Sequence, residues 1–369
     1  MKKGWVTKKL VDVATLQRGF DLPTQDRLSG DVPLVTSSGI SEMVRNSAVR
    51  GPGVATGRSG SIGNVFYIEE DFWPLNTALY VKDFHGNNPR FVFHLLKDFD
   101  LKRFATGTGV PTLNRNFVHD ELVNVPPLAE QQRIVGLLDE AFEGIATARA
   151  TAEKNLQNAR ALFESHLQSV FSQRGKGWVE KKLSEVCEIT SKLVDPRKKE
   201  FLDLTHVGAG NIESQTGAFV DLMTAREEGL ISGKFLFDPS MVLYSKIRPY
   251  LMKAARPDFS GLCSADMYPL APFPTEITRD YLFHLLMSKG FTDYAIQGSA
   301  RAGMPKVNRE HLFEFKVWLP PVTLQKDLAE KLDALHEETQ RLASLYTRKL
   351  AALEALKKSL LHRAFSGEL

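Results

Sequence analysis

Apolar residues recur at steps of three and four along two long stretches, residues 126–174 and 320–369. This spacing is typical of amphipathic helices. A di-proline pair opens each stretch, which suits a helix start, and no proline follows within either stretch. We therefore predict two helices of about 45 residues, each roughly 68 Å long. The predicted apolar stripes are Ile134, Leu138, Ala141, Ile145, Ala148, Ala152, Leu156, Ala159, Leu162 and Leu167, and Leu328, Leu332, Leu335, Thr339, Leu342, Tyr346, Leu350, Leu353, Leu356 and Leu361.

The two stretches are copies of one unit. A constant offset of 194 residues places Pro126 on Pro320 and Gln131 on Gln325 without a gap. Shorter matches precede each copy: GWVTKKL at residue 4 returns as GWVEKKL at residue 177, and VPTLN at residue 110 returns as MPKVN at residue 304. The internal repeat predicts the order module, helix, module, helix. One stripe is rich in alanine and the other in leucine, so we expect the helices to pack on each other.

The modules have a mixed pattern. Short apolar runs bounded by glycine, proline and asparagine predict strands at 65–68 and 241–244. One-sided apolar spacing predicts helices at 91–104 and 281–294. A final strand, 122–125 or 315–318, leads into each di-proline. The predicted fold class is α+β: two similar modules, each with a small sheet, held apart by two long antiparallel helices in a coiled-coil-like, pseudo-two-fold arrangement. The predicted domains are 1–125, 126–174, 175–319 and 320–369.

The amino-acid composition excludes few kinds of function. The net charge of +3 and the isoelectric point of about 8.7 permit a nucleic-acid partner without requiring one. Cys187 and Cys263 form no spacing pattern, so a disulfide framework is not expected and a reducing compartment fits. Neither a signal peptide nor an apolar run long enough to cross a bilayer is recognisable. We therefore predict a cytoplasmic protein without a membrane partner.

Each module carries two polar loops that suit nucleic-acid binding. The glycine-rich segment 55–64 offers arginine and asparagine side chains, which can pair with guanine and adenine, and the basic segment 244–250 matches it in the second module. A second polar loop, 106–115 or 298–308, could hold phosphates. The alternative for all four loops is an ordinary solvated turn. The candidate residues are Thr56, Arg58, Ser59, Ser61, Asn64, Thr106, Thr108, Asn114 and Arg115 in the first module, and Ser245, Lys246, Arg248, Tyr250, Ser299, Arg301, Lys306 and Asn308 in the second.

Enzyme chemistry finds no support in the sequence. The Gly208-Ala209-Gly210 run lacks the third glycine of a dinucleotide site, since Glu213 stands there. Neither a cysteine–histidine metal spacing nor a nucleophile elbow is present. His94 and His284 follow aromatic residues on predicted helices, so we interpret them as structural. We therefore predict neither a catalytic residue nor a metal site.

These residues together resemble a known family. The matches are the openings around Trp5 and Trp178, GRSGSIG at 57–63, PTLN at 111–114, PPLAEQQRI at 126–134 and AFSGEL at 364–369. With two modules that are each followed by a long helix, the chain resembles the specificity subunit (HsdS) of type I restriction-modification systems. The second module departs from the motif, because Ser245-Lys246-Ile247-Arg248 stands in place of the glycine-rich run.

The resemblance implies a function for every part of the chain. Each module would be a target recognition domain reading one half of a split site on double-stranded DNA. Two methylase (HsdM) subunits and the restriction-motor (HsdR) subunits would join the complex, a DNA adenine methyltransferase and type I site-specific deoxyribonuclease. S-adenosylmethionine, ATP and Mg would bind those partners, and this chain would hold no cofactor and carry no catalysis. Exposed helix faces bearing Leu137, Phe142, Phe163 and Leu345 would serve protein partners.

Two alternatives stay open at this point. The chain could be the recognition subunit of a related type II-like restriction enzyme, or a coiled-coil scaffold that binds only proteins. Salt-dependent, sequence-specific DNA binding separates the first prediction from the scaffold.

The helix between the modules is expected to set the spacing of the two half-sites. Inserting four residues near Ala148–Ala152 adds about 6 Å and nearly one turn, so the apolar stripe is almost kept. The gap in the methylated motif should then grow by about one to two base pairs, with both half-sites unchanged. A two-residue insertion should instead rotate the stripe and impair assembly. Methylome sequencing of hosts carrying the parent and variant subunits tests this, and an unchanged gap in an active four-residue variant would contradict it.

Overall fold

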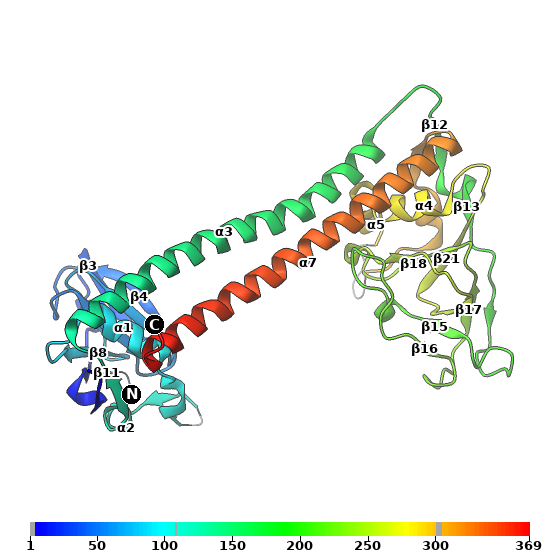
Figure 1. Ribbon diagram of the computed structural model, residues 1–369. Coiled ribbons are helices and arrows are strands. Elements are labelled where there is room, and N and C mark those ends of the chain that lie inside the picture. The colour runs from blue at the N-terminus through cyan, green and yellow to red at the C-terminus, as the bar shows by residue number, and fades with distance from the viewer. Residues whose placement is uncertain (1–3, 108, 300–304) are drawn as a thin grey trace. The chain divides into compact units, whose positions relative to one another are not determined.

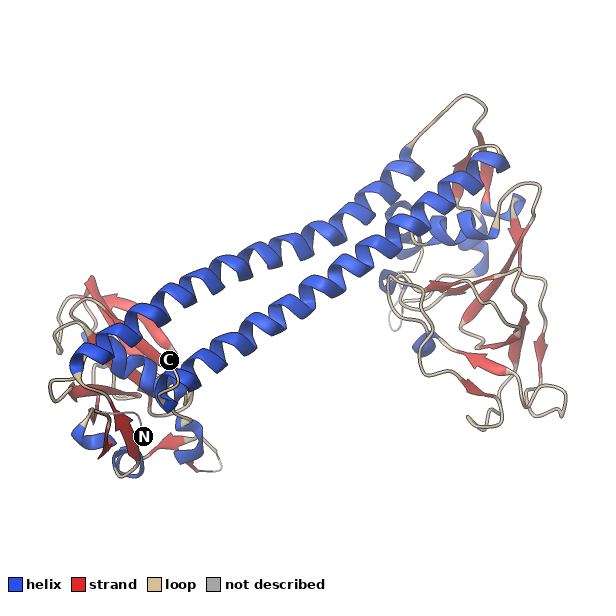
Figure 2. Ribbon diagram, in the orientation of Figure 1, coloured by secondary structure: helices blue, strands red, loops and turns tan. Residues whose placement is uncertain are grey.

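The computed structural model describes residues 4–107, 109–299 and 305–369. It contains two long helices, α3 (Leu128–Ser172) and α7 (Val322–Ser366), which begin directly after the two di-prolines (Figure 1). The chain forms two compact units, the first up to Glu153 together with Thr347–Leu369, and the second Lys154–Tyr346. Each unit therefore combines one module with one part of each long helix. The predicted α+β class, with two sheet-containing modules and two long helices, is confirmed (Figure 2).

The first module is built on a four-stranded antiparallel sheet in the order β2-β8-β5-β6. A second sheet has the order β4-β3-β7, and helix α1 packs against β5 and β6. Two short pairs, β1 with β11 and β9 with β10, complete the module. The bounds are β1 Val6–Lys9, β2 Thr15–Arg18, β3 Ser29–Thr36, β4 Gly39–Val44, β5 Gly53–Gly57, β6 Val65–Ile68, β7 Trp73–Pro74, β8 Ala78–Asp83, α1 Pro89–Asp98, β9 Ala105–Thr106, β10 Thr112–Leu113, α2 Arg115–His119 and β11 Leu122–Val125.

The second module repeats this sheet in the order β13-β21-β18-β19. Its β12–β22 pair has the register of β1–β11, since Val179 faces Leu319 where Val6 faces Val125. It adds a five-stranded sheet, β14-β17-β20-β15-β16, with a small core of its own. The bounds are β12 Val179–Lys182, β13 Cys187–Glu188, β14 Leu193–Val194, β15 Thr205–Val207, β16 Met223–Thr224, β17 Lys234–Phe237, β18 Val242–Ser245, β19 Ala254–Ala255, β20 Gly261–Cys263, β21 Met267–Pro272, α4 Arg279–Leu286, α5 Lys289–Gln297, α6 Arg309–Phe313 and β22 Lys316–Leu319.

Both module helices are shorter than the apolar spacing predicts. The predicted helix 91–104 ends at Asp98 and continues as a 3-10 turn, Leu101–Phe104. The predicted helix 281–294 is two helices, because Ser288 accepts a hydrogen bond from the N–H of Phe291 and so caps α5. A serine cap of this kind starts a new helix even where the apolar spacing continues.

The long helices contribute to both module cores. In the first unit Ile134 and Leu138 of α3 share one core with Leu361 and Phe365 of α7. In the second unit Leu167 of α3 shares a core with Leu332 of α7, among residues of α4 and α5. In the first unit the early residues of α3 lie against the late residues of α7, and in the second unit the late residues of α3 lie against the early residues of α7. Within each unit, moving forward along α3 means moving backward along α7, so the two helices are antiparallel there, as predicted.

The predicted stripe is wrong at one position of the repeat. Leu162 is 53% exposed and the equivalent Leu356 is 47% exposed. The next residues turn inward instead: Phe163 packs against His336 in the second unit, and Lys357 lies over the ring of Phe142 in the first. Steps of four from Ala159 to Phe163 and Leu167 therefore follow the buried face better than the predicted step to Leu162.

A buried glutamine fixes the start of each long helix to its module. The Nε2 of Gln131 donates to the Pro126 carbonyl at 3.0 Å, while its Oε1 accepts from the backbone N–H of Asn88, the N-cap of α1, at 2.9 Å. Gln325 repeats both bonds, donating to Pro320 at 3.0 Å and accepting from Thr278, the N-cap of α4, at 3.0 Å. The repeat thus preserves one complete hydrogen-bonded junction.

A histidine–aspartate contact reinforces each junction. His94 of α1 donates from Nε2 to Asp139 of α3 at 3.1 Å, and Arg90 binds the other carboxylate oxygen at 2.6 Å. In the second unit Asp333 takes the same place, bound by His284 at 2.9 Å and by Arg256 at 2.7 Å. Both histidines are at most 2% exposed. Their positions agree with the structural role inferred from sequence.

Burial keeps these histidines neutral. The Nδ1 atoms of His94 and His284 are buried and have no partner among the described residues, so a proton added there would be unsatisfied. Burial lowers the pKa of His94 to about 4, although Asp139 acts in the opposite direction. Burial would raise the pKa of Asp333, but the hydrogen bonds from His284 and Arg256 outweigh it and hold that pKa well below its usual range.

The lowered pKa of His94 makes stability depend on pH. Above pH about 6.5 the imidazole is neutral in both states and the native fold loses nothing. As the pH falls toward 4 the unfolded chain takes up the proton first, so the free energy of unfolding should decrease by up to about 3 kcal/mol. His94→Gln, which donates to Asp139 without titrating, is the matched variant. Urea unfolding between pH 7.5 and 4 should show a steeper decline for the parent, and parallel declines would contradict this assignment.

Candidate nucleic-acid interface

The two polar loops predicted in the first module lie side by side. The loop after β5 and the loop before β10 are joined by backbone hydrogen bonds from Leu113 to Arg58 at 2.7 Å and from Gly60 to Pro111 at 3.0 Å. An isolated β-bridge between Ser59 and Thr112 continues this contact. Segments that are about fifty residues apart in the sequence therefore form one surface.

The second module joins its two polar loops by the same backbone bonds but with different residues. We call this bonded pair of loops the frame of each module. Val307 donates to Lys246 at 2.8 Å and Arg248 donates to Pro305 at 2.9 Å. A bridge joins Ile247 to Lys306. These bonds pair position by position with those of the first module. Lys246, Ile247 and Arg248 are therefore the structural counterparts of Arg58, Ser59 and Gly60, respectively.

A third segment supports each frame, and sequence analysis missed it. The backbone N–H groups of Arg58 and Ser59 both donate to the Thr77 carbonyl, at 2.9 and 3.1 Å. In the second module Lys246 donates to the Asp266 carbonyl at 3.0 Å. Thr77 and Asp266 each directly precede a strand, β8 and β21. In the sequence, these two residues are marked only by a short polar run before an apolar strand. Such runs occur at many turns, so they do not identify a supporting segment.

Two glycines close the first loop. A Cβ atom on Gly57 would lie 1.8 Å from the Ser61 carbonyl oxygen, so no other residue fits without a backbone shift. Gly63 has a positive φ of 93°, and a Cβ there would come within 2.9 Å of the Lys102 side chain. The side chain of Lys102 therefore lies against the loop and brings a positive charge to it. Sequence analysis did not predict this contact.

The first-module candidates divide into presented and buried side chains. Ser61 and Asn64 are exposed, and Arg58 is half-buried with Nη1 donating to the Asn76 carbonyl at 3.1 Å. Thr56, in contrast, is fully buried and donates its hydroxyl to the Asn64 carbonyl at 2.7 Å. The structure therefore gives Thr56 a supporting role inside the loop, in place of the direct contact expected from sequence.

Several other candidates serve the local fold. The side-chain oxygens of Asn114 and Asn308 cap α2 and α6, accepting from the N–H groups of Asn116 at 3.0 Å and His311 at 2.7 Å. Exposed Thr106 donates to the Thr112 carbonyl at 3.3 Å, and exposed Arg115 reaches the Leu16 carbonyl at 3.4 Å. Ser59 is half-buried in the bridge. The candidates Thr108 and Arg301 lie outside the described residues.

In the second module, two candidate serines face inward. Ser245 and Ser299 are each 2% exposed, and their hydroxyls donate to the backbone carbonyls of Ile247 at 3.2 Å and Ile296 at 2.8 Å. Their side chains are therefore not presented to a ligand, which corrects the expectation from sequence. Arg248 and Tyr250 are exposed.

Two lysines of the second module share one acidic neighbour. Lys246 donates to the Ala265 carbonyl, lies 3.9 Å from Asp266, and sits over the Tyr268 ring. Burial, with a smaller contribution from the positive charge of Lys306, lowers the pKa of Lys246. Lys306 is half exposed and binds Asp266 at 3.1 Å. The ammonium of Lys246 is thus engaged within the module, whereas that of Lys306 faces solvent on one side.

Comparison with known proteins assigns the family. Residues 2–156 and 175–347 match the Methylase_S family, described as "Type I restriction modification DNA specificity domain". The chain belongs to this family. The two matched segments contain the two modules, so each module carries one copy of the domain.

Curated relatives and solved structures agree with the family. The specificity subunit of the type I restriction enzyme EcoDI from Escherichia coli is 28% identical over 76% of this chain and 70% of its own length. That of MjaVIII from Methanocaldococcus jannaschii is 22% identical over 74% and 68%. One solved structure, described as showing the complex assembly and conformational transition of the type I R-M system, contains a chain that superposes on this one with a TM-score of 0.76. The two chains are 19% identical, and the match covers 100% of this chain and 99% of the solved chain. The HsdS subunit from Thermoanaerobacter tengcongensis gives 0.63 at 20% identity, covering 100% and 98%.

The function follows at the level of the family. This specificity subunit serves DNA recognition in a type I restriction-modification system, and specificity subunits are the non-catalytic members of such systems. Among the described residues, no three His, Cys, Asp or Glu side chains gather as a metal site. No helix in the described part of the chain has the length and apolarity needed to span a membrane.

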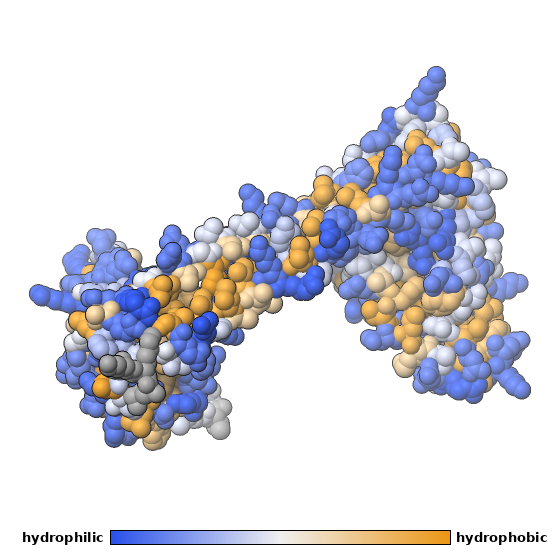
Figure 3. Space-filling view, viewed as in Figure 1, coloured by the Kyte–Doolittle hydropathy of each residue, from blue (hydrophilic) through white to orange (hydrophobic). Residues whose placement is uncertain are grey.

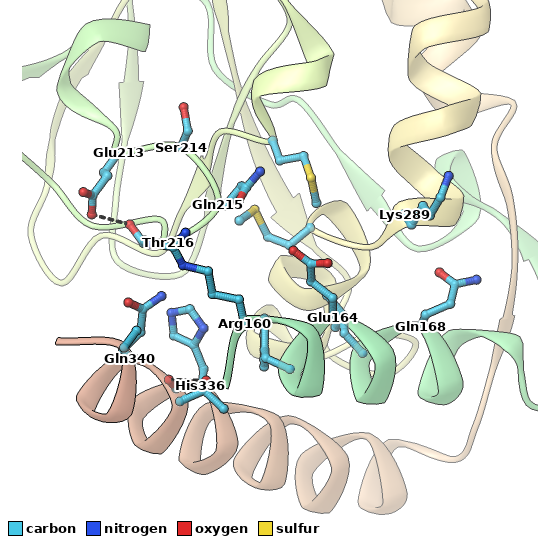
Figure 4. Close-up of a pocket in the computed structure, with 16 residues that line it drawn as sticks. Arg160, Glu164, Gln168, Glu213, Ser214, Gln215, Thr216, Lys289, His336 and Gln340 are labelled. Atoms are coloured by element: carbon cyan, nitrogen blue, oxygen red, sulfur yellow. Dashed lines mark hydrogen bonds between the residues drawn. The ribbon is translucent and has the colours of Figure 1, made fainter. Parts of the chain in front are cut away.

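One cavity of the specificity subunit is lined by residues outside the four polar loops. It has a volume of about 590 Å³ and lies in the second unit, where Arg160 and Glu164 of α3 and His336 of α7 face the loop 213–216 (Figure 4). In the repeat, Phe142 holds the position of His336, and its ring packs against His94. The smaller imidazole at 336 leaves more space beside the module than phenylalanine would.

The exposed apolar surface of the helices differs from the sequence expectation. Leu137 and Leu345 are 43% and 45% exposed, as expected. Phe142 and Phe163 instead pack against His94 and His336 and are only partly exposed. Apolar side chains are visible on the surface of the long helices in Figure 3. The exposed leucines of the two long helices are Leu128, Leu137, Leu162, Leu324, Leu345 and Leu356.

The supporting role of Thr56 can be separated from DNA contact. Thr56→Val keeps the shape but removes the buried hydrogen bond to Asn64, so the free energy of unfolding should fall by about 1 kcal/mol. Thr56→Ser keeps the hydroxyl and should lose less. Urea unfolding measures the stability, and the methylated DNA motif should be unchanged in both variants. An altered motif in Thr56→Val at unchanged stability would show that Thr56 contacts DNA.

Proposed function

We propose that this specificity subunit recognises a bipartite double-stranded DNA target, with one module reading each half-site. The observation that carries the proposal is the repeated frame: both modules hold the same three segments together by equivalent backbone bonds but present different side chains. A common frame suits a common partner, the duplex. Different side chains on it suit different base sequences, because sequence is read through hydrogen bonds to base edges.

The side chains around the first frame suggest a division of labour. Arg58 and Asn64 stand on the loop that leads from β5 to β6, and their side chains have the hydrogen-bonding groups that recognise guanine and adenine. Lys102 lies against the same loop, and exposed Arg115 begins the helix after the second loop. These two cations would contact phosphates and set the register of the module on DNA.

The partners belong to the same proposal. Two methylase (HsdM) subunits and the restriction-motor (HsdR) subunits would assemble on this chain. The exposed leucines of the long helices support a protein-binding role, since large apolar side chains left in contact with water are common at interaction sites. S-adenosylmethionine, ATP and Mg would bind those partners. This chain would supply sequence recognition and position the partners.

The two alternatives are weighed by the same residues. A protein-only scaffold would not need exposed arginine, asparagine and tyrosine side chains on a frame conserved between its two modules. The described surface has them at Arg248, Tyr250 and Asn64. A type II-like recognition subunit would have the same frame, so the genes next to this one distinguish that alternative.

The proposal is tested by methylome sequencing of a host that carries this subunit with its methylase. The expected motif consists of two unrelated specific half-sites separated by unspecified base pairs. Purification through a tag on the subunit should yield a complex containing two methylase copies. One continuous short motif would contradict the bipartite target. A lone subunit that binds its specific site tightly without methylase would contradict the proposed assembly.

A further inference from the structure

One position of the frame is left-handed in both modules. Gly60 has φ of 87° in the first module. Its counterpart Arg248 has φ of 51° and ψ of 60°. The two residues make the equivalent bond, each donating its N–H to a proline carbonyl of the neighbouring loop, Pro111 or Pro305. The frame itself therefore requires this backbone conformation, which glycine adopts without strain.

An arginine at this position has a cost that the fold does not recover. A non-glycine residue is destabilised in the left-handed region, because its Cβ atom comes too close to the following carbonyl oxygen. The Arg248 side chain is exposed and forms neither a hydrogen bond nor an ion pair with any described residue. Only its backbone contributes to the frame. Strain that persists without a structural return is typical of residues kept for function.

The counterpart of Arg58 cannot take this role in the second module. Lys246 is bound to the Ala265 carbonyl, close to Asp266 and over Tyr268, with little of its side chain exposed. A lysine also lacks the planar fork of donors that pairs with a guanine edge. The exposed guanidinium lies two residues further along the same loop, at Arg248. Tyr250 is exposed beside it, after the buried Pro249.

We propose that Arg248 determines specificity in the second module by donating two hydrogen bonds to O6 and N7 of a guanine in its half-site. This inference rests on the proposed function and names the residue that carries it. The first module places its arginine at position 58 and glycine at the left-handed position, whereas the second places its free arginine at the left-handed position. The two half-sites would therefore differ in where along the frame the guanine contact is made.

Arg248→Gly tests this in the complex with methylase, because it relieves the strain while removing the guanidinium. The midpoint of thermal unfolding should stay the same or rise. The preference for guanine at one position of one half-site should fall by about tenfold or more in the methylome. Arg248→Lys keeps the charge but not the fork and should lose the same preference. Arg58→Ala is the matched control in the first module and should change only the other half-site.

The possible results separate a failure of the Arg248 inference from a failure of the proposed function. A bipartite motif that Arg248→Gly leaves unchanged would overturn this inference alone. A clear drop in thermal stability for that variant would also overturn it, since Arg248 would then be structural. Full recovery of the preference by Arg248→Lys would replace base recognition with a phosphate contact. A continuous motif in the parent would overturn the proposed function and this inference with it.

Discussion

The attachment of each module to its long helix depends on a buried amide. Gln131 and Gln325 bind the proline carbonyl before their own helix and the N-cap residue of the module helix at the same time. Two helix starts are thereby fixed to each other by directional bonds. An apolar contact alone would let the module slide or rotate on the helix, whereas a buried amide out of place would leave several groups unsatisfied. The remaining geometry of each unit follows from this junction.

The aspartate contacts add orientation to this attachment. Asp139 and Asp333 lie two helical turns beyond the glutamines, so each module helix is held at two points along the long helix. The histidines that reach them are neutral and enclosed by aromatic rings, including Phe142 in the first unit and Phe163 in the second. The junction therefore combines polar direction with apolar enclosure, and the repeat preserves both in each unit.

Sequence predicted the features that depend on local chemistry. The di-prolines gave the helix starts, and strands β6 and β11 have the bounds expected from their apolar runs. The helix interruption at Ser288 was missed because a serine cap competes with an apolar period that continues through it. The inward orientation of Phe163 in place of Leu162 was also missed, because the larger apolar side chain of Phe163 packs against the module better than that of Leu162.

The candidate site was predicted in outline but not in detail. The four polar loops were recognised, and the structure joins them in pairs. Which side chains they present could not be foreseen from sequence. Thr56 and Ser245 lie in paired strands and turn inward, where their hydroxyls donate to the carbonyls of Asn64 and Ile247. The supports at Thr77 and Asp266 act through backbone carbonyls, which every residue possesses and which no sequence pattern marks.

The left-handed position of the frame has a genetic consequence. A single-nucleotide change converts a glycine codon into an arginine codon, and this chain holds glycine at one copy of the position and arginine at the other. The backbone bonds that define the frame are the same in both cases. One point mutation can thus add or remove a long cationic side chain here without rebuilding the loop. Divergence of the two modules after duplication would have been accessible through such small steps.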